Sequence, residues 1–457
     1  MGLYSAGLRT FVLPFLLKRD NRQEALRYYD FLEKSQYWPK EMLVEYQLSK
    51  IRELLDYSYR NSRYYRNLFD RLGAKPEEIK NFDDFARLPI LTRDHLFEHR
   101  LDILSREYDI ASVQEVLTGG TTGQQAILHR SYDSYNIKAA LAWRHESWMG
   151  RRPCDKMAFF WPAHVDLYDA GSWKTRFKRR YLEREVMYYS GTFAPEIMMR
   201  FYNDVTRFRP SYFKVFPNAL YGFAQFLMER KLRPLKLKGI LSTGEPLFEN
   251  QRRLFEELFQ CRVFDMYGSR EVGNTASECP AHEGLHIAME TSYVEFVRDG
   301  RAVAPGEEGE ILITDLTNFA FPMIRYRIND YGVPLDRSCS CGRNLSLMSP
   351  GIGRLFDDIL RPDGVKMSGN LLGYHLTTDH EIHIGQMQIV QESLTDFKVL
   401  ITDRPEPNQK VFEFIRNKMA LILGDRIRVD IEVVREIPRE KSGKMRYVVS
   451  KIASTRT

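Results

Sequence analysis

The sequence predicts an α/β fold followed by a smaller α+β unit, and three observations carry this prediction. The chain has 457 residues, which favours about two to three domains. Between residues 156 and 267, short apolar runs typical of strands alternate with helical patterns, which favours a largely parallel sheet. After about residue 285 strand patterns dominate, and the last hundred or so residues are of ordinary domain size.

The composition excludes several classes of protein. Hydrophobic residues make up 43% and aromatic residues 13%, which suits a buried core and excludes a disordered chain. The net charge of +6 permits an anionic substrate such as a nucleotide, but it does not indicate nucleic acid as a partner. Five cysteines are too few for a disulfide framework, so we expect a reducing compartment, the cytoplasm.

The N-terminal segment Phe11–Leu17 is apolar but is interrupted by Pro14. It is shorter than the roughly 20 apolar residues that a membrane-spanning helix needs, and no signal-peptide cleavage site follows. We favour an amphipathic helix packed on the core. The alternative is a segment that lies on a membrane surface, because Lys18, Arg19 and Arg22 follow. Membrane contact is therefore expected to be peripheral at most.

Hydrophobic periodicity predicts the elements in order. Between residues 23 and 70, apolar residues at steps of three and four indicate a long amphipathic helix: Val44, Leu48, Ile51, Leu55 and Tyr59. A short helix at 94–99 and a strand at 113–117 follow. The middle is predicted as strands 156–161, 239–242 and 262–267, with helices 195–207, 220–231 and 250–259. The rest is predicted as strands 287–297, 309–314, 358–360, 386–391, 396–401 and 428–434, with a helix at 411–423.

A loop rich in glycine and threonine follows the strand at 113–117. It reads Thr118-Gly119-Gly120-Thr121-Thr122-Gly123. Small and hydroxylated residues let main-chain N–H groups approach a phosphate closely. No Lys-Ser/Thr pair follows, so this is not a Walker loop.

Four further segments carry groups suited to a nucleotide. Each alone is more often a plain turn. Aromatic rings can stack on a base, carboxylates can hold Mg²⁺ or ribose hydroxyls, and a lysine can neutralise phosphate. The segments are Ser242-Thr243-Gly244-Glu245-Pro246, Tyr267-Gly268-Ser269-Arg270-Glu271, Tyr326-Arg327-Ile328-Asn329-Asp330 with Gly353-Arg354 downstream, and Ile437-Pro438-Arg439-Glu440-Lys441-Ser442-Gly443-Lys444.

The order and spacing of these five motifs resemble the adenylate-forming superfamily of acyl-CoA synthetases. The chain is most similar to the phenylacetate–CoA ligase group and its CapK-like branch. The form of the glycine and threonine loop points there, as do Leu32–Trp38 and Asn61–Tyr65. The resemblance covers most of the chain from about residue 110 to its end.

The resemblance implies a large N-terminal adenylation domain of layered sheets and helices, residues 1–356, and a C-terminal lid, residues 357–457, with a hinge near Asp357. It implies an ATP-dependent ligase that converts a small carboxylic acid to an acyl-adenylate and passes the acyl group to CoA or another thiol, amine or hydroxyl acceptor. A nucleotidyl transferase and a non-catalytic scaffold are the alternatives. Whether the chain forms a homodimer is left open by the sequence.

Residue roles follow from the resemblance. Thr118 to Gly123, with Thr121 among the catalytic groups, would cradle the β- and γ-phosphates of ATP. Gly244, Glu245 and Pro246 would line the adenine pocket. The remaining nucleotide and Mg²⁺ contacts would come from Tyr267, Gly268, Ser269, Glu271, Asp330 and Arg354, and Lys444 would bridge the α-phosphate and the substrate carboxylate.

The sequence departs from the superfamily pattern in three places. Gln124-Gln125-Ala126 follow the phosphate loop, where Lys or another residue and then Pro are usual. The usual Arg-Thr-Gly-Asp reads Arg-Ile-Asn-Asp at 327–330. The hinge motif has an extra residue after Arg354. None of these changes removes a charged catalytic group.

Three cysteines and nearby histidines form a candidate metal site. Cys279 lies near His282 and His286, and Cys339 and Cys341 follow about sixty residues later. Three thiolates and one imidazole make a closed, structural zinc site. Buried free cysteines are the alternative. Either histidine could be the fourth ligand, but Gly284-Leu285-His286 looks like the histidine-bearing turn of the family's zinc site, so His286 is preferred.

Overall fold

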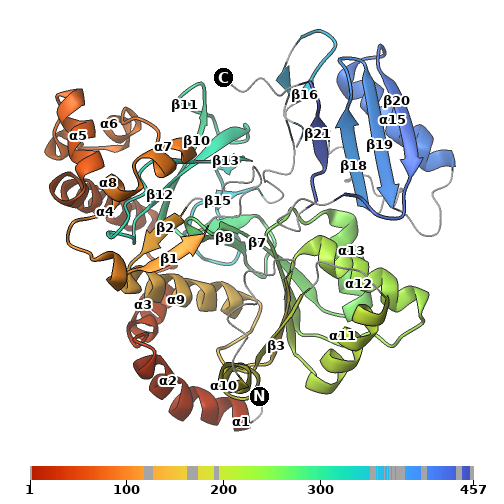
Figure 1. Cartoon of the computed structure of the whole chain (residues 1–457), viewed down its shortest axis with the longest axis horizontal. Coiled ribbons are helices and arrows are strands. Elements are labelled where there is room, and N and C mark those ends of the chain that lie inside the picture. The colour runs from red at the N-terminus through yellow and green to blue at the C-terminus, as the bar shows by residue number, and fades with distance from the viewer. Residues whose placement is uncertain are drawn as a thin grey trace. The chain divides into compact units, whose positions relative to one another are not determined.

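The computed structural model describes most of the chain, which forms two compact units (Figure 1). Unit 1 comprises Met1–Asp155, Lys178–Arg184 and Phe264–Pro350, and unit 2 comprises Lys156–Phe177, Glu185–Val263 and Gly351–Thr457. The expected lid boundary after residue 356 stays a prediction. The described residues are 3–117, 127–161, 173–189, 195–349, 357, 359–364, 366–367, 369, 372, 376, 386–402, 409–438 and 445–452.

Helices dominate the first 150 residues of unit 1. The predicted long helix is confirmed as α4, and the predicted short helix as α7. No helix in the described part of the chain is long and apolar enough to cross a membrane. The helices are α1 (Leu3–Gly7), the π-helical turn η1 (Leu8–Val12), α2 (Leu13–Arg19), α3 (Glu24–Ser35), α4 (Lys40–Asn61), α5 (Arg63–Leu72), α6 (Phe82–Ala86), α7 (Arg93–Glu98), α8 (Arg100–Ile103) and α9 (Tyr132–Trp148), with short 3₁₀ turns at Pro76–Glu78 and Ile110–Ser112.

The strands of unit 1 pair antiparallel, so the predicted parallel arrangement holds only in unit 2. One group has the order β11-β10-β12-β13, a second β14-β15-β9-β8-β7, and β1 and β2 form a hairpin. The strands are β1 (Gln114–Leu117), β2 (Ile127–Arg130), β7 (Arg262–Ser269), β8 (Gly273–Glu278), β9 (Leu285–Ile287), β10 (Ser292–Arg298), β11 (Arg301–Ala302), β12 (Gly309–Asp315), β13 (Tyr326–Gly332), β14 (Pro334–Leu335) and β15 (Leu347–Met348).

One predicted strand of unit 1 is wrong. The apolar run 287–297 is divided between β9 and β10 by a tight turn. The main-chain N–H groups of Thr291 and Ser292 both donate to the carbonyl of Ala288, at 3.0 Å each, and the Thr291 hydroxyl donates to the same carbonyl at 3.2 Å. These local bonds satisfy the chain inside the run and end the strand, which apolar periodicity alone does not reveal.

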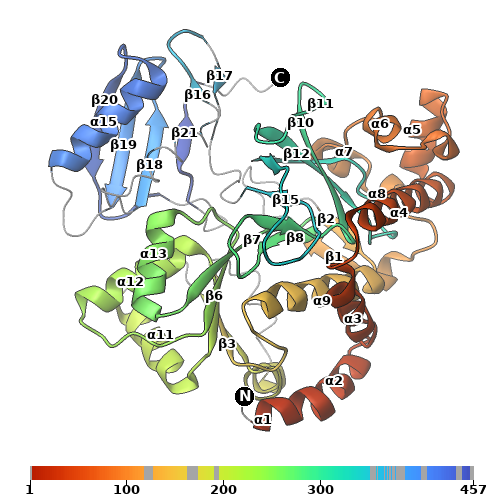
Figure 2. The ribbon, with the colours of Figure 1, turned by 180° about the vertical axis from the view of Figure 1, so that it is seen from behind.

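Unit 2 contains the predicted parallel sheet, with the order β6-β5-β3-β4 (Figure 2). Buried aromatic and aliphatic side chains join it to its helices, and Phe160, Phe213 and Phe223 lie in this core. The elements are β3 (Met157–Trp161), β4 (Glu185–Tyr189), α11 (Pro195–Phe208), β5 (Tyr212–Val215), α12 (Pro217–Glu229), β6 (Gly239–Thr243) and α13 (Glu249–Phe259). Two helical segments lie between β3 and β4 in the chain: α10 (Trp173–Phe177) and, in unit 1, the π-helical η5 (Lys178–Glu183).

The C-terminal part of unit 2 has the predicted α+β character. A mixed sheet of order β20-β19-β18-β21 has a buried core of its own that includes Ile389, Val399 and, from α15, Ile415. The predicted strands and helix in this region match the structure within about two residues. The elements are β16 (Ile359–Leu360), β17 (Lys366–Met367), β18 (Gln386–Gln391), β19 (Asp396–Thr402), α15 (Gln409–Leu423), β20 (Arg428–Val433) and β21 (Val448–Ser450).

Candidate functional site

In unit 1, two of the predicted nucleotide-binding residues lie side by side. The Tyr267 hydroxyl, from β7, donates to Oδ2 of Asp330, from β13, at 2.8 Å. Both side chains are buried, at 9% and 8% exposed. The bond fixes the direction of the tyrosine ring and holds the carboxylate beside it. The structure thus brings together an aromatic face and a carboxylate from motifs about sixty residues apart.

The segment that carries Asp330 bulges out of its strand pair. Opposite it, the register of β12 and β13 shifts between Glu310 and Leu312. Asn329 sits in this bulge with φ +58°, the left-handed region that glycine and asparagine tolerate best. Asparagine can therefore meet the conformational demand at the position where the usual Arg-Thr-Gly-Asp pattern has glycine.

The start of β13 is anchored to the N-terminal helical region. The N–H of Leu91 donates to the Arg325 carbonyl at 3.1 Å, and the N–H of Arg327 donates back to Leu91 at 2.9 Å. The Arg325 guanidinium pairs with Glu295 at 2.9 Å, and both side chains are buried. Burial raises the pKa of Glu295, which the arginine opposes.

Two basic side chains hold the main chain around Glu271, and the sequence analysis missed both. The Arg130 guanidinium donates to the carbonyls of Arg270 and Glu271 at 3.0 and 3.2 Å. Lys138, from α9, donates to the Val272 carbonyl and pairs with Asp315 at 2.8 Å. One sequence signal could have revealed Lys138: it is a lysine among the residues that form the buried side of α9. We call Arg130, Lys138 and Asp315 the carbonyl clamp.

Glycines let the clamp approach closely. A Cβ at Gly273, where φ is +80°, would lie 3.1 Å from Cδ of Lys138. A Cβ at Gly268 would lie 2.6 Å from the Gly273 carbonyl oxygen. Burial lowers the pKa of Lys138 to about 8, against the opposing charge of Asp315. The clamp is thus buried as well as charged, and its main-chain partners have little room to move.

The Glu271 carboxylate is buried without being committed to a protein partner. Its residue is 6% exposed, and within the described residues no hydrogen bond or ion pair holds the carboxylate. A buried carboxylate of this kind is a suitable oxygen ligand for a divalent cation. Nearby, Ser269 Oγ accepts the N–H of Val272 at 3.3 Å, so this hydroxyl shapes the turn.

In unit 2, the Ser242–Pro246 segment begins in the last two residues of β6, and Glu245 is hydrogen-bonded to two other segments. Its Oε2 accepts Nδ2 of Asn218 at 3.0 Å, and its Oε1 accepts the N–H of Met445 at 3.4 Å. Asn218, which is fully buried, also bonds the Tyr447 hydroxyl at 2.9 Å. Sequence analysis missed Asn218 and Tyr447, because neither lies in a motif. Pro246 is also buried.

Several predicted site residues lie outside the described residues: the phosphate loop Thr118 to Gly123, Arg354 and Lys444. The structure describes residues next to two of these segments, namely 117 and 127 beside the loop and 445 after Lys444. Strands β1 and β2 pair from Leu117↔Ile127 to Gln114↔Arg130, so residues 117 and 127 are adjacent at one end of the hairpin. Met445, directly after Lys444, bonds Glu245 as above.

Also in unit 1, three cysteines and His286 converge. Their four candidate ligand atoms all lie within 4.8 Å of one another. Cys279 Sγ is 3.5 Å from Cys339 Sγ, and Cys341 Sγ is 3.4 Å from Nε2 of His286. Zinc–sulfur bonds of about 2.3 Å imply tetrahedral edges of about 3.8 Å, so the donor set fits a closed zinc site.

The alternative ligand His282 does not join this cluster. Its Nδ1 lies 3.2 Å from Oε2 of Glu278, and its ring packs on Phe264 with centroids 4.9 Å apart. Burial lowers the pKa of His286 to about 4, which keeps its imidazole neutral. The two cysteine-bearing loops are also joined directly, since Glu283 accepts the main-chain N–H of Ser340 at 2.8 Å.

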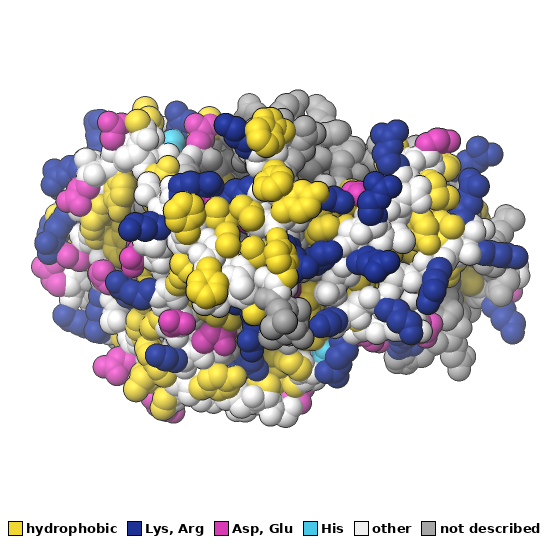
Figure 3. All heavy atoms as spheres, turned by 90° about the horizontal axis from the view of Figure 1, so that it is seen from below, with side chains coloured by type: hydrophobic (Ala, Val, Ile, Leu, Met, Phe, Trp, Pro, Cys, Tyr) yellow, Lys and Arg dark blue, Asp and Glu magenta, His cyan; other side chains and the backbone are white. Residues whose placement is uncertain are grey.

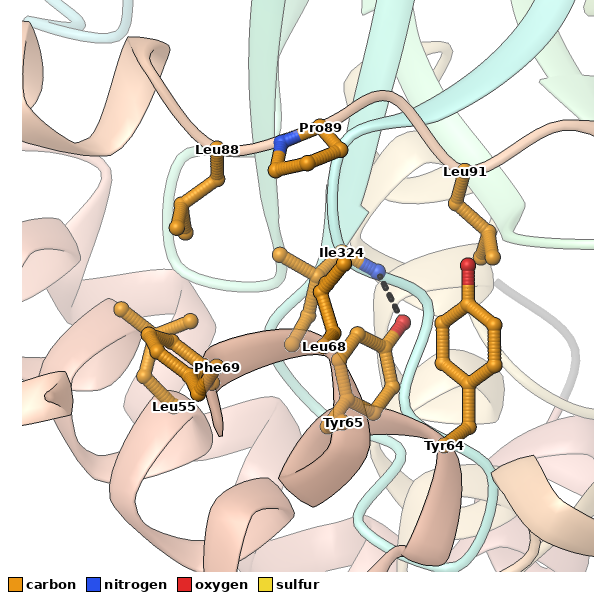
Figure 4. A pocket seen from close by; sticks show the side chains of 9 residues that line it. All are labelled: Leu55, Tyr64, Tyr65, Leu68, Phe69, Leu88, Pro89, Leu91 and Ile324. Atoms are coloured by element: carbon orange, nitrogen blue, oxygen red, sulfur yellow. Dashed lines mark hydrogen bonds between the residues drawn. The ribbon is translucent and has the colours of Figure 1, made fainter. Parts of the chain in front are cut away.

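The Asn61–Tyr65 motif lines a small apolar pocket between α4, α5 and residues 88–91 (Figure 4). The Tyr65 hydroxyl donates to the Pro322 carbonyl at 3.0 Å and accepts the N–H of Ile324 at 3.3 Å. These bonds support the chain just before β13. The motif therefore has a structural explanation in this fold.

The segment at the end of β3 is only partly described. Phe160 is 1% exposed and packs its ring on Phe201 and Phe223, with centroids 4.2 and 5.4 Å apart, so it belongs to the core. Residues 162–164 of the same segment lie outside the described residues. Phe160 is thus a core aromatic side chain at the end of a strand.

Comparison with known proteins identifies relatives that match most of the chain. Residues 359–451 match the family model of the CapK C-terminal domain. A phenylacetate-coenzyme A ligase of Thermus thermophilus is 25% identical over 444 residues, which cover 90% of this chain and 97% of that protein. The Escherichia coli phenylacetate-coenzyme A ligase is 26% identical and covers 86% of this chain and 92% of its own length.

Solved structures share the fold. A 2-hydroxyisobutyryl-CoA ligase in complex with an acyl-AMP superposes with a TM-score of 0.72 at 20% identity, covering 92% of this chain and 93% of that one. An anthranilate CoA ligase reaches a TM-score of 0.51 at 16% identity, covering 75% and 67%. The α/β fold with a smaller C-terminal domain and the resemblance to the adenylate-forming enzymes are confirmed, and the relatives bear out the predicted class, an ATP-dependent ligase.

Gly244→Ala should destabilise unit 2 by roughly 2–4 kcal/mol, because backbone strain and a ring clash add. Gly244 has φ +80°, and its Cβ would lie 2.5 Å from the Phe216 ring. Gly300→Ala is the matched control, because φ there is +75° but nothing lies within 4 Å of the added Cβ. Urea unfolding measures both. Equal losses in the two variants would contradict the ring contact.

Proposed function

We propose that this chain, a relative of the phenylacetate–CoA ligases with a CapK-type C-terminal domain, activates a carboxylic acid with ATP and transfers the acyl group to CoA. The acid attacks the α-phosphorus of ATP, pyrophosphate leaves, and an acyl-adenylate forms. The acceptor sulfur then displaces AMP. The observation that carries the proposal is the hydrogen-bonded pair of Tyr267 and Asp330, since it joins the two motifs that would hold a nucleoside.

The described residues suit the binding roles. Tyr267 would stack on adenine. Asp330 would accept hydrogen bonds from the ribose hydroxyls, while its Oδ2 also accepts the tyrosine hydroxyl. Glu271 would hold Mg²⁺, and a buried carboxylate with no hydrogen bond or ion pair among the described residues supports that role. Mg²⁺ bound there would offset the charge of the phosphates. The roles of Thr118 to Gly123, Arg354 and Lys444 rest on the resemblance alone.

Catalysis in this scheme needs positioning more than covalent chemistry. Arg130 and Lys138 would act as positioning residues, because they hold the carbonyls of residues 270–272 and so the direction of Glu271. Glu245 would line the adenine pocket while its carboxylate remains bound to Asn218 and to the N–H of Met445. The latter contact lies one residue from Lys444.

Pyrophosphate exchange across a panel of aryl, aliphatic and hydroxy acids tests the adenylation step. Acid-dependent exchange supports the proposal, and mass spectrometry of the products then identifies the acceptor. AMP covalently attached to a hydroxyl acceptor would instead indicate the alternative, a nucleotidyl transferase. The absence of exchange and of nucleotide binding would indicate a scaffold.

We also propose that Cys279, His286, Cys339 and Cys341 hold a structural zinc ion. The four ligand atoms lie within 4.8 Å of one another, and three thiolates with one neutral imidazole suit zinc and leave no position for water. The ion would connect three segments: the loop after β8, which carries Cys279, strand β9, which carries His286, and the segment 339–341. A role in the reaction is not implied.

Cys339→Ser should remove the zinc and destabilise the protein strongly, because zinc binding contributes roughly 10–16 kcal/mol in zinc-finger peptides. Elemental analysis should find about one zinc per wild-type chain and little in the variant. Cys261→Ser is the control, since Cys261 is half-buried outside the cluster. A zinc-free wild type that melts like Cys339→Ser would disprove the site.

Lys444→Ala should impair adenylation by on the order of 10²–10³, because one preorganised charge between two anions is lost. Acyl transfer from synthetic acyl-adenylate should stay near normal, since the family's lid lysine reaches the site only for the first step. The two half-reactions are measured separately. Equal loss in both, or loss in neither, would contradict the assignment.

Lys138→Met combined with Asp315→Asn should raise the Mg²⁺ concentration needed for half-maximal exchange by about tenfold, because Glu271 loses its main-chain support. Replacing both partners avoids leaving a buried charge unpaired. Lys156→Met is the control, since it also removes a lysine-to-carbonyl bond, to Phe208 at 2.7 Å. An unchanged Mg²⁺ dependence, with folding intact by circular dichroism, would remove Lys138 from the site.

A further inference from the structure

The N-terminal helical segment of unit 1 is apolar on two faces. One face is buried and packs Leu8, Leu13 and Leu17 against Cys154, with Trp143 and Leu182 beside them. The opposite face is exposed, although it carries large aromatic side chains: Tyr4 at 59%, Phe11 at 78% and Phe15 at 67%. A helix with apolar side chains on all sides is normally buried on all sides, so the exposed aromatic side chains indicate a binding surface.

We name Tyr4, Phe11, Phe15, Lys18 and Arg19 the N-terminal aromatic face. Phe15 and Lys18, three residues apart, lie on one side of α2, and Phe11 and Tyr4 precede them in η1 and α1. These exposed side chains form a strip along the segment.

The charges around the strip have one sign. Between Leu3 and Arg19 the segment carries Arg9, Lys18 and Arg19 and no acidic residue. The first acid, Asp20, is bound by Arg19 at 2.9 Å and by Lys178 at 2.6 Å. Lys178 also lies 3.2 Å from Glu183, so the acids bordering the strip are already neutralised by cations.

A second segment extends this basic, aromatic surface. The Tyr4 hydroxyl donates to the carbonyl of Tyr181 at 3.2 Å, which joins η5 to the N-terminal helix within unit 1. The Tyr181 side chain is 51% exposed, and Arg179 and Arg180 precede it. Figure 3, which views the molecule from below, shows hydrophobic side chains near the middle of this side, with Lys and Arg side chains and some Asp and Glu side chains around them.

The strip is held firmly from behind. Arg9 donates to the Pro153 carbonyl at 3.0 Å and pairs with Asp155 at 3.3 Å. Arg184 donates to the Ser5 hydroxyl, and its guanidinium carbon lies 5.2 Å from the centroid of the Tyr4 ring. The buried leucines and these bonds fix the outward direction of the aromatic side chains before any partner binds.

We propose that the N-terminal aromatic face docks on an anionic lipid surface. Phe11 and Phe15 would enter the boundary between headgroups and acyl chains, and Lys18 would contact lipid phosphates, with Arg19, which also pairs with Asp20, beside it. The segment Leu3–Arg19 is shorter than a membrane-spanning helix needs, so it would lie in the plane of the interface. This inference does not depend on the proposed function.

Charge favours a membrane over a second copy of this chain. A second copy that met this strip would offer it no opposite charge from the same segment, because Leu3–Arg19 carries cations and no acid. An anionic bilayer supplies both an apolar layer and a dense field of negative charge.

Sedimentation of the full chain with vesicles tests the inference. Binding is expected to vesicles of phosphatidylcholine with phosphatidylglycerol, to weaken with salt, and to be at least tenfold weaker with phosphatidylcholine alone. The double variant Phe11→Ser/Phe15→Ser should lose about a hundredfold in affinity, because each buried phenylalanine contributes on the order of tenfold. Lys18→Glu/Arg19→Glu should lose at least about tenfold, mainly at low salt.

Matched variants elsewhere keep the result specific. Leu421→Ser removes an apolar side chain that is 80% exposed on α15, and Arg63→Glu reverses a charge whose side chain is 79% exposed on α5. Both should bind vesicles like the wild type, and circular dichroism melting checks folding of every variant.

Three results would overturn the inference. They are equal or absent binding to the two kinds of vesicle, loss of binding in the control variants to the same extent, and a wild-type dimer that Phe11→Ser/Phe15→Ser dissociates while vesicles are ignored. The last result would assign the face to a second copy of the chain.

Discussion

The carbonyl clamp is the interaction on which the candidate site of unit 1 depends. Lys138 reaches from α9 to the Val272 carbonyl and to Asp315 at the end of β12, and Arg130 reaches from β2 to the carbonyls of Arg270 and Glu271. One hairpin, one helix and two antiparallel sheets thus meet at three consecutive carbonyls. Because these bonds are buried and charge-assisted, they hold the main chain more firmly than neutral surface contacts would.

Strand β8 is restrained at both ends in consequence. Its first residue, Gly273, lies against the stem of Lys138, and Cys279 of the cysteine–histidine cluster follows its last residue, Glu278. A bound zinc would add a third connection between the loop at 339–341 and this strand. The strand pairs with β7, which carries Tyr267, so both restraints bear on the direction of that ring.

Unit 2 has a comparable centre in Asn218. Its amide bonds Glu245 and Tyr447, and Gln251 donates to its oxygen at 3.1 Å. The asparagine therefore links the loop after β6, the helix α13 and the segment that follows Lys444. A neutral, fully satisfied amide suits this position, because each of its buried polar atoms has a partner.

The two units differ in how far pattern predicts them. Alternation of apolar strands and helices predicted β3, β6, α11 and α13 nearly to their ends, since parallel strands buried on both faces read as continuous apolar runs. The same logic failed for residues 287–297, where local hydrogen bonds to Ala288 divide the run. The antiparallel pairing of β7, β8 and β9 was missed too, because pairing direction depends on loops between strands.

The sequence by itself determined which chemical groups are present: the motifs with Tyr267, Glu271 and Asp330, and the cysteines at 279, 339 and 341. Those groups are local in the chain, and their spacing is visible there. Only the tertiary structure decided that His286 joins the cysteines while His282 turns to Glu278, and that Asn329 occupies a bulge. It also decided that Lys138 and Arg130 hydrogen-bond to the main chain around Glu271. Contacts between residues more than a hundred positions apart depend on packing, which no local sequence pattern records.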